Sequence, residues 1–302
     1  MSNVIDFDSI DANSESLFDV VYEHLALPDS TYLGTRITKK MILVNNDLSV
    51  SDKKLVNSVV QSVEWLNTLK PETLNIPTYV TETVEYIEVA VLKVTLKPDS
   101  SNLGRLKLST INTVSKLFHT LIPYPVILMI ELDGKLAISL ADKRINQSDS
   151  SKLVIKHFYN SQWFAIAGLK CYEKEFLNDF TLKNVSSVNY YELFQGFISM
   201  LLALETSYIS GSYSTQSNRN SNIEKNEHGA LHKDNIPDDS LITEISNEEK
   251  KNLLKELVTL EAELTNIRKK LKKEVQMNEK MRLNLHARKI KQSISKITYQ
   301  LI

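Results

Sequence analysis

Apolar residues three and four positions apart predict several helices in the first 210 residues of the chain. A short helix is expected from Ser14, with a stripe formed by Leu17, Val20, Val21 and Leu25. A longer helix is expected over about residues 52–69, with Ser51 as its N-cap. The stripe of this helix consists of Leu55, Val59, Val63 and Leu66. The same spacing returns over about residues 106–121 and 189–208, which predicts two further helices.

Runs of β-branched and aliphatic residues predict a sheet. The run Glu85–Leu96 is apolar at nearly every position, which is typical of a central strand covered on both faces. Asp133-Gly134, which follows Val126–Leu132 and precedes residues 135–143, favours the positive φ angles of a type I′ turn and therefore predicts a β-hairpin. A further strand is expected over 153–159. Together these elements predict an α+β fold, a mixed sheet with helices packed on it.

Two stripes of large apolar residues run through the last fifty residues, each with the spacing of a coiled-coil seam. The first stripe is Leu253, Leu257, Leu260, Leu264, Ile267 and Leu271, and the second is Leu283, Ala287, Ile290, Ile294, Ile297 and Leu301. Stripes of equal length that change phase near Met277 predict an antiparallel helical hairpin. The open alternative is one longer helix with a register slip that pairs with a second chain as a homodimer.

Composition divides the chain into four parts. Residues 1–13 are expected to form a loose acidic lead, and residues 14–209 the mixed α/β domain. Ser, Asn and Asp dominate residues 210–248, which hold too little apolar surface to offset the entropy of ordering. This segment is therefore expected to be a flexible linker. Residues 249–302 carry the helical hairpin or coiled coil.

Charge and cysteine content indicate the cellular compartment in which the protein is expected. The net charge of −1 hides a basic C-terminal segment, because residues 251–302 contain 13 Lys and Arg against five Asp and Glu. The single cysteine, Cys171, cannot form an intrachain disulfide, which favours a reducing, cytoplasmic compartment. The acidic N-terminus lacks the basic start and apolar run of a signal peptide, and no membrane contact is expected.

Motifs for familiar cofactor chemistry are missing from the sequence. Neither GxGxxG nor GxxxxGK[ST] occurs, and there is no HExxH, CxxC or GxSxG. His228 and His232 are four residues apart in the expected linker without a third ligand nearby, so no metal and no cofactor are expected. The strongest catalytic alternative is a metal-dependent nuclease that uses Glu131, Asp133 and Lys135, since a carboxylate can hold the metal while a lysine steadies the attacking water.

Basic residues offer candidate contacts with phosphate groups or with the carboxylates of a protein partner. Lys143 and Arg144 follow the expected hairpin strand. The outer surface of the C-terminal helices is expected to present Arg268, Lys269, Lys272, Lys273 and Arg288. The same residues could contact DNA or RNA phosphates, and that alternative stays open.

Several collinear stretches resemble a prokaryotic family known as domain of unknown function 4391. These stretches are SVEWLNTLKPETLNIP (residues 62–77), EYIEVAVLKVTL (85–96), LIPYPVILMIELDGKLAISLADKRINQ (121–147) and KKLKKEVQMNEKMRLNLHARKIK (269–291). The Ser/Asn-rich linker matches nothing in the family. The resemblance implies an accessory subunit of a restriction-like or phage-defence system, because members of the family are encoded near genes for DNA methyltransferases and helicases.

The resulting functional hypothesis is a non-enzymatic adaptor subunit. Its α/β domain would bind one partner, such as a helicase or DNA methyltransferase, and its C-terminal helices another partner or a second copy. Two alternatives remain, a metal-dependent nuclease and a nucleic-acid-binding protein that uses the basic C-terminal helices.

Overall fold

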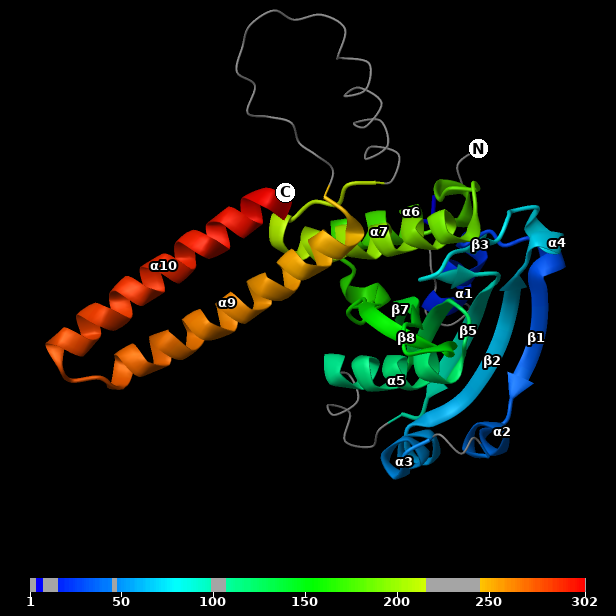
Figure 1. The fold of residues 1–302 in the computed structure, drawn as a ribbon, viewed down its shortest axis with the longest axis horizontal. Helices are drawn as coiled ribbons and strands as arrows, with labels where there is room; N and C mark the ends of the chain where they lie inside the picture. Colours follow the sequence, from blue (N-terminus) through cyan, green and yellow to red (C-terminus); the bar gives the residue numbers. More distant parts are fainter. Residues whose placement is uncertain (1–3, 8–15, 45–47, 99–106, 216–244, 302) are drawn as a thin grey trace, which may run out of the picture. The chain divides into compact units, whose positions relative to one another are not determined.

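The structure is a computed structural model that describes residues 4–7, 16–44, 48–98, 107–215 and 245–301 of the 302-residue chain. These residues form two compact units (Figure 1). The sheet unit contains the described residues up to Leu201, and the hairpin unit contains Leu202–Ser214 with the C-terminal helices. Most of the expected linker, with His228 and His232, lies outside the described residues.

The sheet unit is built on a six-stranded mixed sheet, which confirms the predicted fold class. In spatial order the strands are β1 (Tyr32–Ile37), β2 (Val60–Leu69), β5 (Val89–Leu96), β6 (Val126–Leu132), β7 (Lys135–Asn146) and β8 (Asp149–Asn160). Strands β5 and β6 are parallel, and the other neighbouring pairs are antiparallel. Helix α5 (Leu108–Leu121) supplies the crossover that a parallel pair requires.

Six helices, two short strands and three 3₁₀ turns complete the described part of the sheet unit, and the last of these helices continues past Leu201 into the hairpin unit. The helices are α1 (Leu17–His24), α2 (Lys39–Leu43), α3 (Val50–Ser58), α4 (Pro71–Leu74), α6 (Cys171–Asp179) and α7 (Tyr190–Ser210). Strands β3 (Tyr79–Val80) and β4 (Glu85–Tyr86) form a small second sheet, and single 3₁₀ turns cover Asp29–Thr31, Ile166–Gly168 and Leu182–Asn184.

Helices α5 and α1 lie on opposite faces of the sheet. On the α5 face, Leu92 and Val94 of β5 join the core formed with Ile111 and Val114 of α5. The alternating residue Lys93 points to the other face, where its ammonium lies 3.7 Å from the centre of the Phe18 ring of α1. Strand β5 is therefore covered on both sides, which confirms the central position predicted for residues 89–96. The predicted strand is too long at its start, because Glu85–Tyr86 form β4 in the second sheet.

The helix predicted over residues 52–69 is wrong in its second half. Helix α3 ends at Ser58, and residues 60–69 form β2 between β1 and β5. A central position supplies backbone hydrogen-bond partners along both edges of β2, and this outweighs the helical spacing of its apolar residues. The N-cap of α3 is Ser49, not Ser51, because the Ser49 hydroxyl accepts from the Asp52 N–H at 3.2 Å.

The Asp133-Gly134 turn confirms the predicted hairpin. Asp133 has a φ of 48° and Gly134 a φ of 70°, the positive values that a type I′ turn requires. Leu132 pairs with Lys135 directly across the turn. The strand predicted over 153–159 is also present, and it is longer, because β8 covers Asp149–Asn160.

Part of the N-terminal lead is anchored rather than loose. The Ile5 N–H donates to Asn178 Oδ1 of α6 at 2.6 Å, and the Phe7 side chain is buried. These two contacts attach residues 4–7 to the sheet unit.

Helix α7 is long and apolar enough to cross a bilayer by length and composition. More than half of its most apolar window is buried in the protein. Phe194, Phe197 and Ile198 are fully buried, which is typical of a core helix.

The C-terminal residues form the predicted helical hairpin. Helices α9 (Asn247–Lys273) and α10 (Met277–Leu301) pack against one another within one chain. Glu274 has an extended backbone, and its Oε1 accepts from the N–H groups of Val275 and Gln276 at 2.9 Å each. This break excludes the alternative of a single long helix.

Candidate functional site

The three residues of the nuclease hypothesis do not converge. Asp133 is exposed at the tip of the hairpin turn. Glu131 pairs with Leu136 across the hairpin, whereas Lys135 pairs with Leu132, so Glu131 and Lys135 point to opposite faces of the sheet. Among the residues that the structure describes, no group of three His, Cys, Asp or Glu side chains is placed to hold a metal ion.

Glu131 instead belongs to a charged row on the α1 face of the sheet. Its Oε2 lies 3.1 Å from the Lys93 ammonium and accepts a 3.4 Å hydrogen bond from the Thr95 hydroxyl. Glu64 lies directly opposite Lys93 in the register, and Arg36 lies opposite Glu64. Charges therefore alternate across four strands. Sequence reasoning missed this row because its members come from separate segments that only the strand register brings together.

Lys143 is a correction to the predicted surface contacts. Its side chain is buried, and its ammonium donates to the backbone carbonyls of Ile122 and Tyr124, the latter at 2.5 Å. Ile122 is the C-cap of α5, where unsatisfied carbonyls favour a cation. Burial lowers the pKa of Lys143 from 10.5 to about 7. Lys143 therefore caps a helix inside the protein and is not available to a partner.

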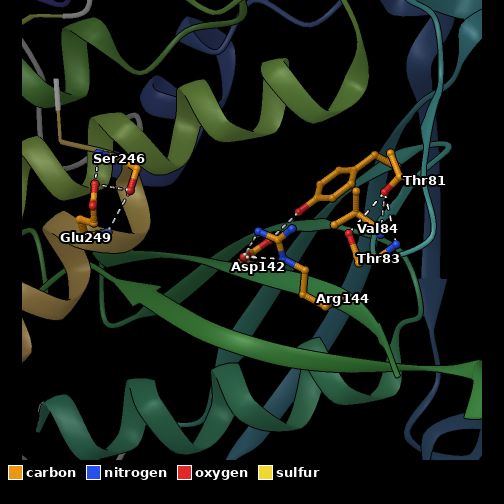
Figure 2. A network of polar contacts seen from close by, with 8 residues as sticks. Thr81, Thr83, Val84, Asp142, Arg144, Ser246 and Glu249 are labelled. Atoms are coloured by element: carbon orange, nitrogen blue, oxygen red, sulfur yellow. Dashed lines mark hydrogen bonds and ion pairs between the residues drawn. The ribbon is translucent and has the colours of Figure 1, made fainter. Parts of the chain in front are cut away.

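Arg144 is already engaged by its own chain (Figure 2). Its Nε and Nη2 donate to Asp142 Oδ2 at 3.1 and 3.0 Å. The buried Tyr86 hydroxyl donates to Asp142 Oδ1 at 3.1 Å, and burial together with Asp142 raises the Tyr86 pKa well above its usual value. Both carboxylate oxygens of Asp142 thus accept hydrogen bonds, and this network links β4 to β7. Arg144 therefore stabilises the fold through its contact with Asp142.

The seam of the C-terminal hairpin follows the predicted residues. Each of the twelve is buried or partly buried, and none is exposed. Leu264 and Ile267 of α9 meet Ala287 and Ile290 of α10 at its centre. The first turn of α9 is held by a capping box in which Ser246 and Glu249 exchange hydrogen bonds (Figure 2). Lys251 adds an ion pair to Glu205 of α7 at 2.7 Å, which anchors α9 within the hairpin unit.

A second apolar face on α10 was not predicted from the sequence. Met277, Met281 and Leu285 follow one another at four-residue spacing, so they lie about 40° apart around the helix axis. Tyr299 lies at the same angle as Met281 further along the helix, and the seam residues lie on the opposite side. The exposed fractions of these four side chains are 72%, 60%, 62% and 87%. We call this set the outer row.

The basic residues predicted for the hairpin surround these apolar side chains. Arg268, Lys269, Lys272, Lys273 and Arg288 are all exposed. Helix α10 carries six Lys and Arg but only one acidic residue, Glu279. The hairpin therefore combines a filled internal seam with an apolar and cationic outer surface.

Comparison with known proteins places the chain in a family. A search of curated proteins and a search of solved structures find no match. A family model matches residues 25–236, which is more than half of the chain. The match includes residues 210–236 of the expected linker, which was expected to match nothing in the family. It ends before α9, so it does not support the resemblance over residues 269–291. The chain belongs to the family described as domain of unknown function (DUF4391).

Proposed function

We propose that this protein is a non-enzymatic adaptor subunit whose C-terminal helical hairpin binds a protein partner. The outer row is the observation that carries this proposal. Soluble proteins leave single apolar side chains exposed, but a row of Met, Leu and Tyr on one helix face is typical of an interaction surface. The seam between α9 and α10 is already filled, so hairpin formation does not use these side chains.

The partner class follows from the family resemblance given above. A helicase or DNA methyltransferase of a restriction-like or phage-defence system is the first candidate, with the sheet unit binding one component and the hairpin another. A cytoplasmic location is part of the same proposal and is supported by the single, exposed Cys171.

The test is co-expression of the full-length chain with the products of the genes that flank its own. Size-exclusion chromatography with light scattering should give a complex of defined stoichiometry. The chain alone should not cleave DNA in the presence of Mg²⁺ or Mn²⁺. A chain that stays uncomplexed with every neighbour, or that cleaves DNA by itself, contradicts the adaptor proposal.

Nucleic-acid binding is a second candidate that the charge of the hairpin favours. The 13 basic residues against five acidic residues after position 250 would supply phosphate contacts. Fluorescence anisotropy with a labelled DNA duplex tests this function. The logarithm of the affinity should fall linearly with the logarithm of the salt concentration, and Lys269→Glu with Lys273→Glu should reduce the slope. A salt-independent affinity contradicts it.

A further inference from the structure

We infer that the outer row of α10 binds an acidic amphipathic helix of a partner protein, which packs as a third helix on the hairpin. This inference rests on the proposed adaptor function and specifies the chemistry of the partner. It uses the spacing of the outer row, the charge around that row and the closed seam on the other side of α10.

The geometry of the outer row fits a helix better than an extended peptide. Met277, Met281 and Leu285 span eight positions, or about 12 Å of helix. Tyr299 lies on the same face 14 positions further on, and Arg288, Gln292 and Ser295 separate it from Leu285. Side chains that recur at four-residue spacing form a ridge along the axis, and such a ridge packs into the groove of another helix. A partner helix of comparable length can contact Met277, Met281 and Leu285 together.

The charges beside the row select an acidic partner. Arg288 is exposed and lies one turn after Leu285. Arg282 follows Met281, and its 82% exposed side chain lies 3.7 Å from Glu279 in a solvent-exposed ion pair, for which a carboxylate of the partner would compete. Glutamate or aspartate flanking the apolar face of a partner helix would meet these guanidinium groups. Glu279 is the only acidic residue of α10 that would oppose such a partner.

A second copy of this chain is disfavoured by the same charges. Two outer rows packed against one another would bring six Lys and Arg of one α10 next to six of the other. Like charges across an interface suppress association.

Nucleic acid is disfavoured as the ligand of the outer row for another reason. Phosphates bind cations and hydrogen-bond donors, whereas the centre of this surface consists of thioether and aliphatic groups.

The experiment uses the full-length chain and two fluorescent helical peptides of 25 residues. Both peptides carry the same Leu and Ile face, and the flanking positions are Glu in one peptide and Lys in the other. The variant Met281→Ser with Leu285→Ser removes the centre of the outer row from exposed positions. Val50→Ser is the matched control, because Val50 is 86% exposed in the sheet unit.

We expect the Glu peptide to bind, with an affinity that falls as salt is added. The double variant should weaken binding by at least about tenfold, as truncation of hot-spot side chains does, and Val50→Ser should leave it unchanged. Equal binding of both peptides overturns the inference, as does no binding of either peptide or unchanged binding to the double variant. If neither peptide binds and the double variant loses self-association, the outer row binds a second copy and the inference is overturned. If neither peptide binds and the double variant loses DNA binding, the row binds nucleic acid and the inference is likewise overturned.

The complex with the co-expressed partner separates this inference from the proposed function. If that complex forms and the double variant leaves it intact, the adaptor function stands and the inference fails. If no partner complex forms but the Glu peptide binds through the outer row, the inference stands and the adaptor proposal fails.

Discussion

Lys143→Met should change how the stability of the sheet unit depends on pH. In the folded protein burial holds the Lys143 pKa at about 7, whereas an unfolded chain has the ordinary value of 10.5. Between these two pH values the unfolded state binds about one more proton than the folded state at this position. The free energy of unfolding of the wild type therefore gains a contribution that increases with pH and is complete above pH 10.5.

The size of this contribution follows from proton linkage. One proton of difference changes the free energy of unfolding by about 1.4 kcal/mol per pH unit. From pH 8 to pH 10 the wild type should gain between about 2 and 3 kcal/mol relative to the Met variant, because the other groups titrate alike in both proteins. Methionine fills a similar volume, so the variant is expected to keep the packing around α5.

Urea unfolding at pH 8, 9 and 10 measures this difference. Trp65 and Trp163 are the two tryptophans of the chain, and both lie in the sheet unit, so their fluorescence reports its unfolding. Lys40→Met on α2 is the control, because Lys40 is exposed. If the free energy of unfolding changes equally with pH in wild type and Lys143→Met, the reasoning is refuted. In that case the hydrogen bonds to the carbonyls of Ile122 and Tyr124 offset the cost of desolvating the ammonium, and the pKa of Lys143 is not lowered.

Three further changes test the fold. Gly134→Val should lower the free energy of unfolding by about 1 kcal/mol, because a β-branched residue disfavours a φ of 70°. Urea unfolding measures this loss, with Lys135→Ala as the control variant. Asp142→Ala should cost about 2 kcal/mol by the same assay, since it leaves Arg144 and Tyr86 without their shared acceptor. Ile290→Ala should destabilise the hairpin by about 3 kcal/mol and speed amide hydrogen exchange in α9 and α10 but not in β5; unchanged exchange would contradict the packed seam.

Local features of the chain could be predicted from the sequence because their causes are local. The Asp133-Gly134 hairpin depends on the φ angles that two neighbouring residues adopt. The C-terminal hairpin depends on the phase of two apolar stripes and on the few residues between them. Strand β5 was recognisable because a continuous apolar run fits burial on both faces. None of these requires knowledge of which distant segment packs nearby.

The sheet register decided what the sequence left undetermined. Residues 60–69 have helical spacing, yet they form a strand because β1 and β5 supply hydrogen-bond partners along both edges. Lys143 and Glu131 looked like surface chemistry, but the fold directs one to the C-terminus of α5 and pairs the other with Lys93. Each of these outcomes depends on contacts between residues about 20 to 40 positions apart, which local spacing does not encode. The exposed outer row of α10 likewise became recognisable only once the partner face of that helix was occupied by α9.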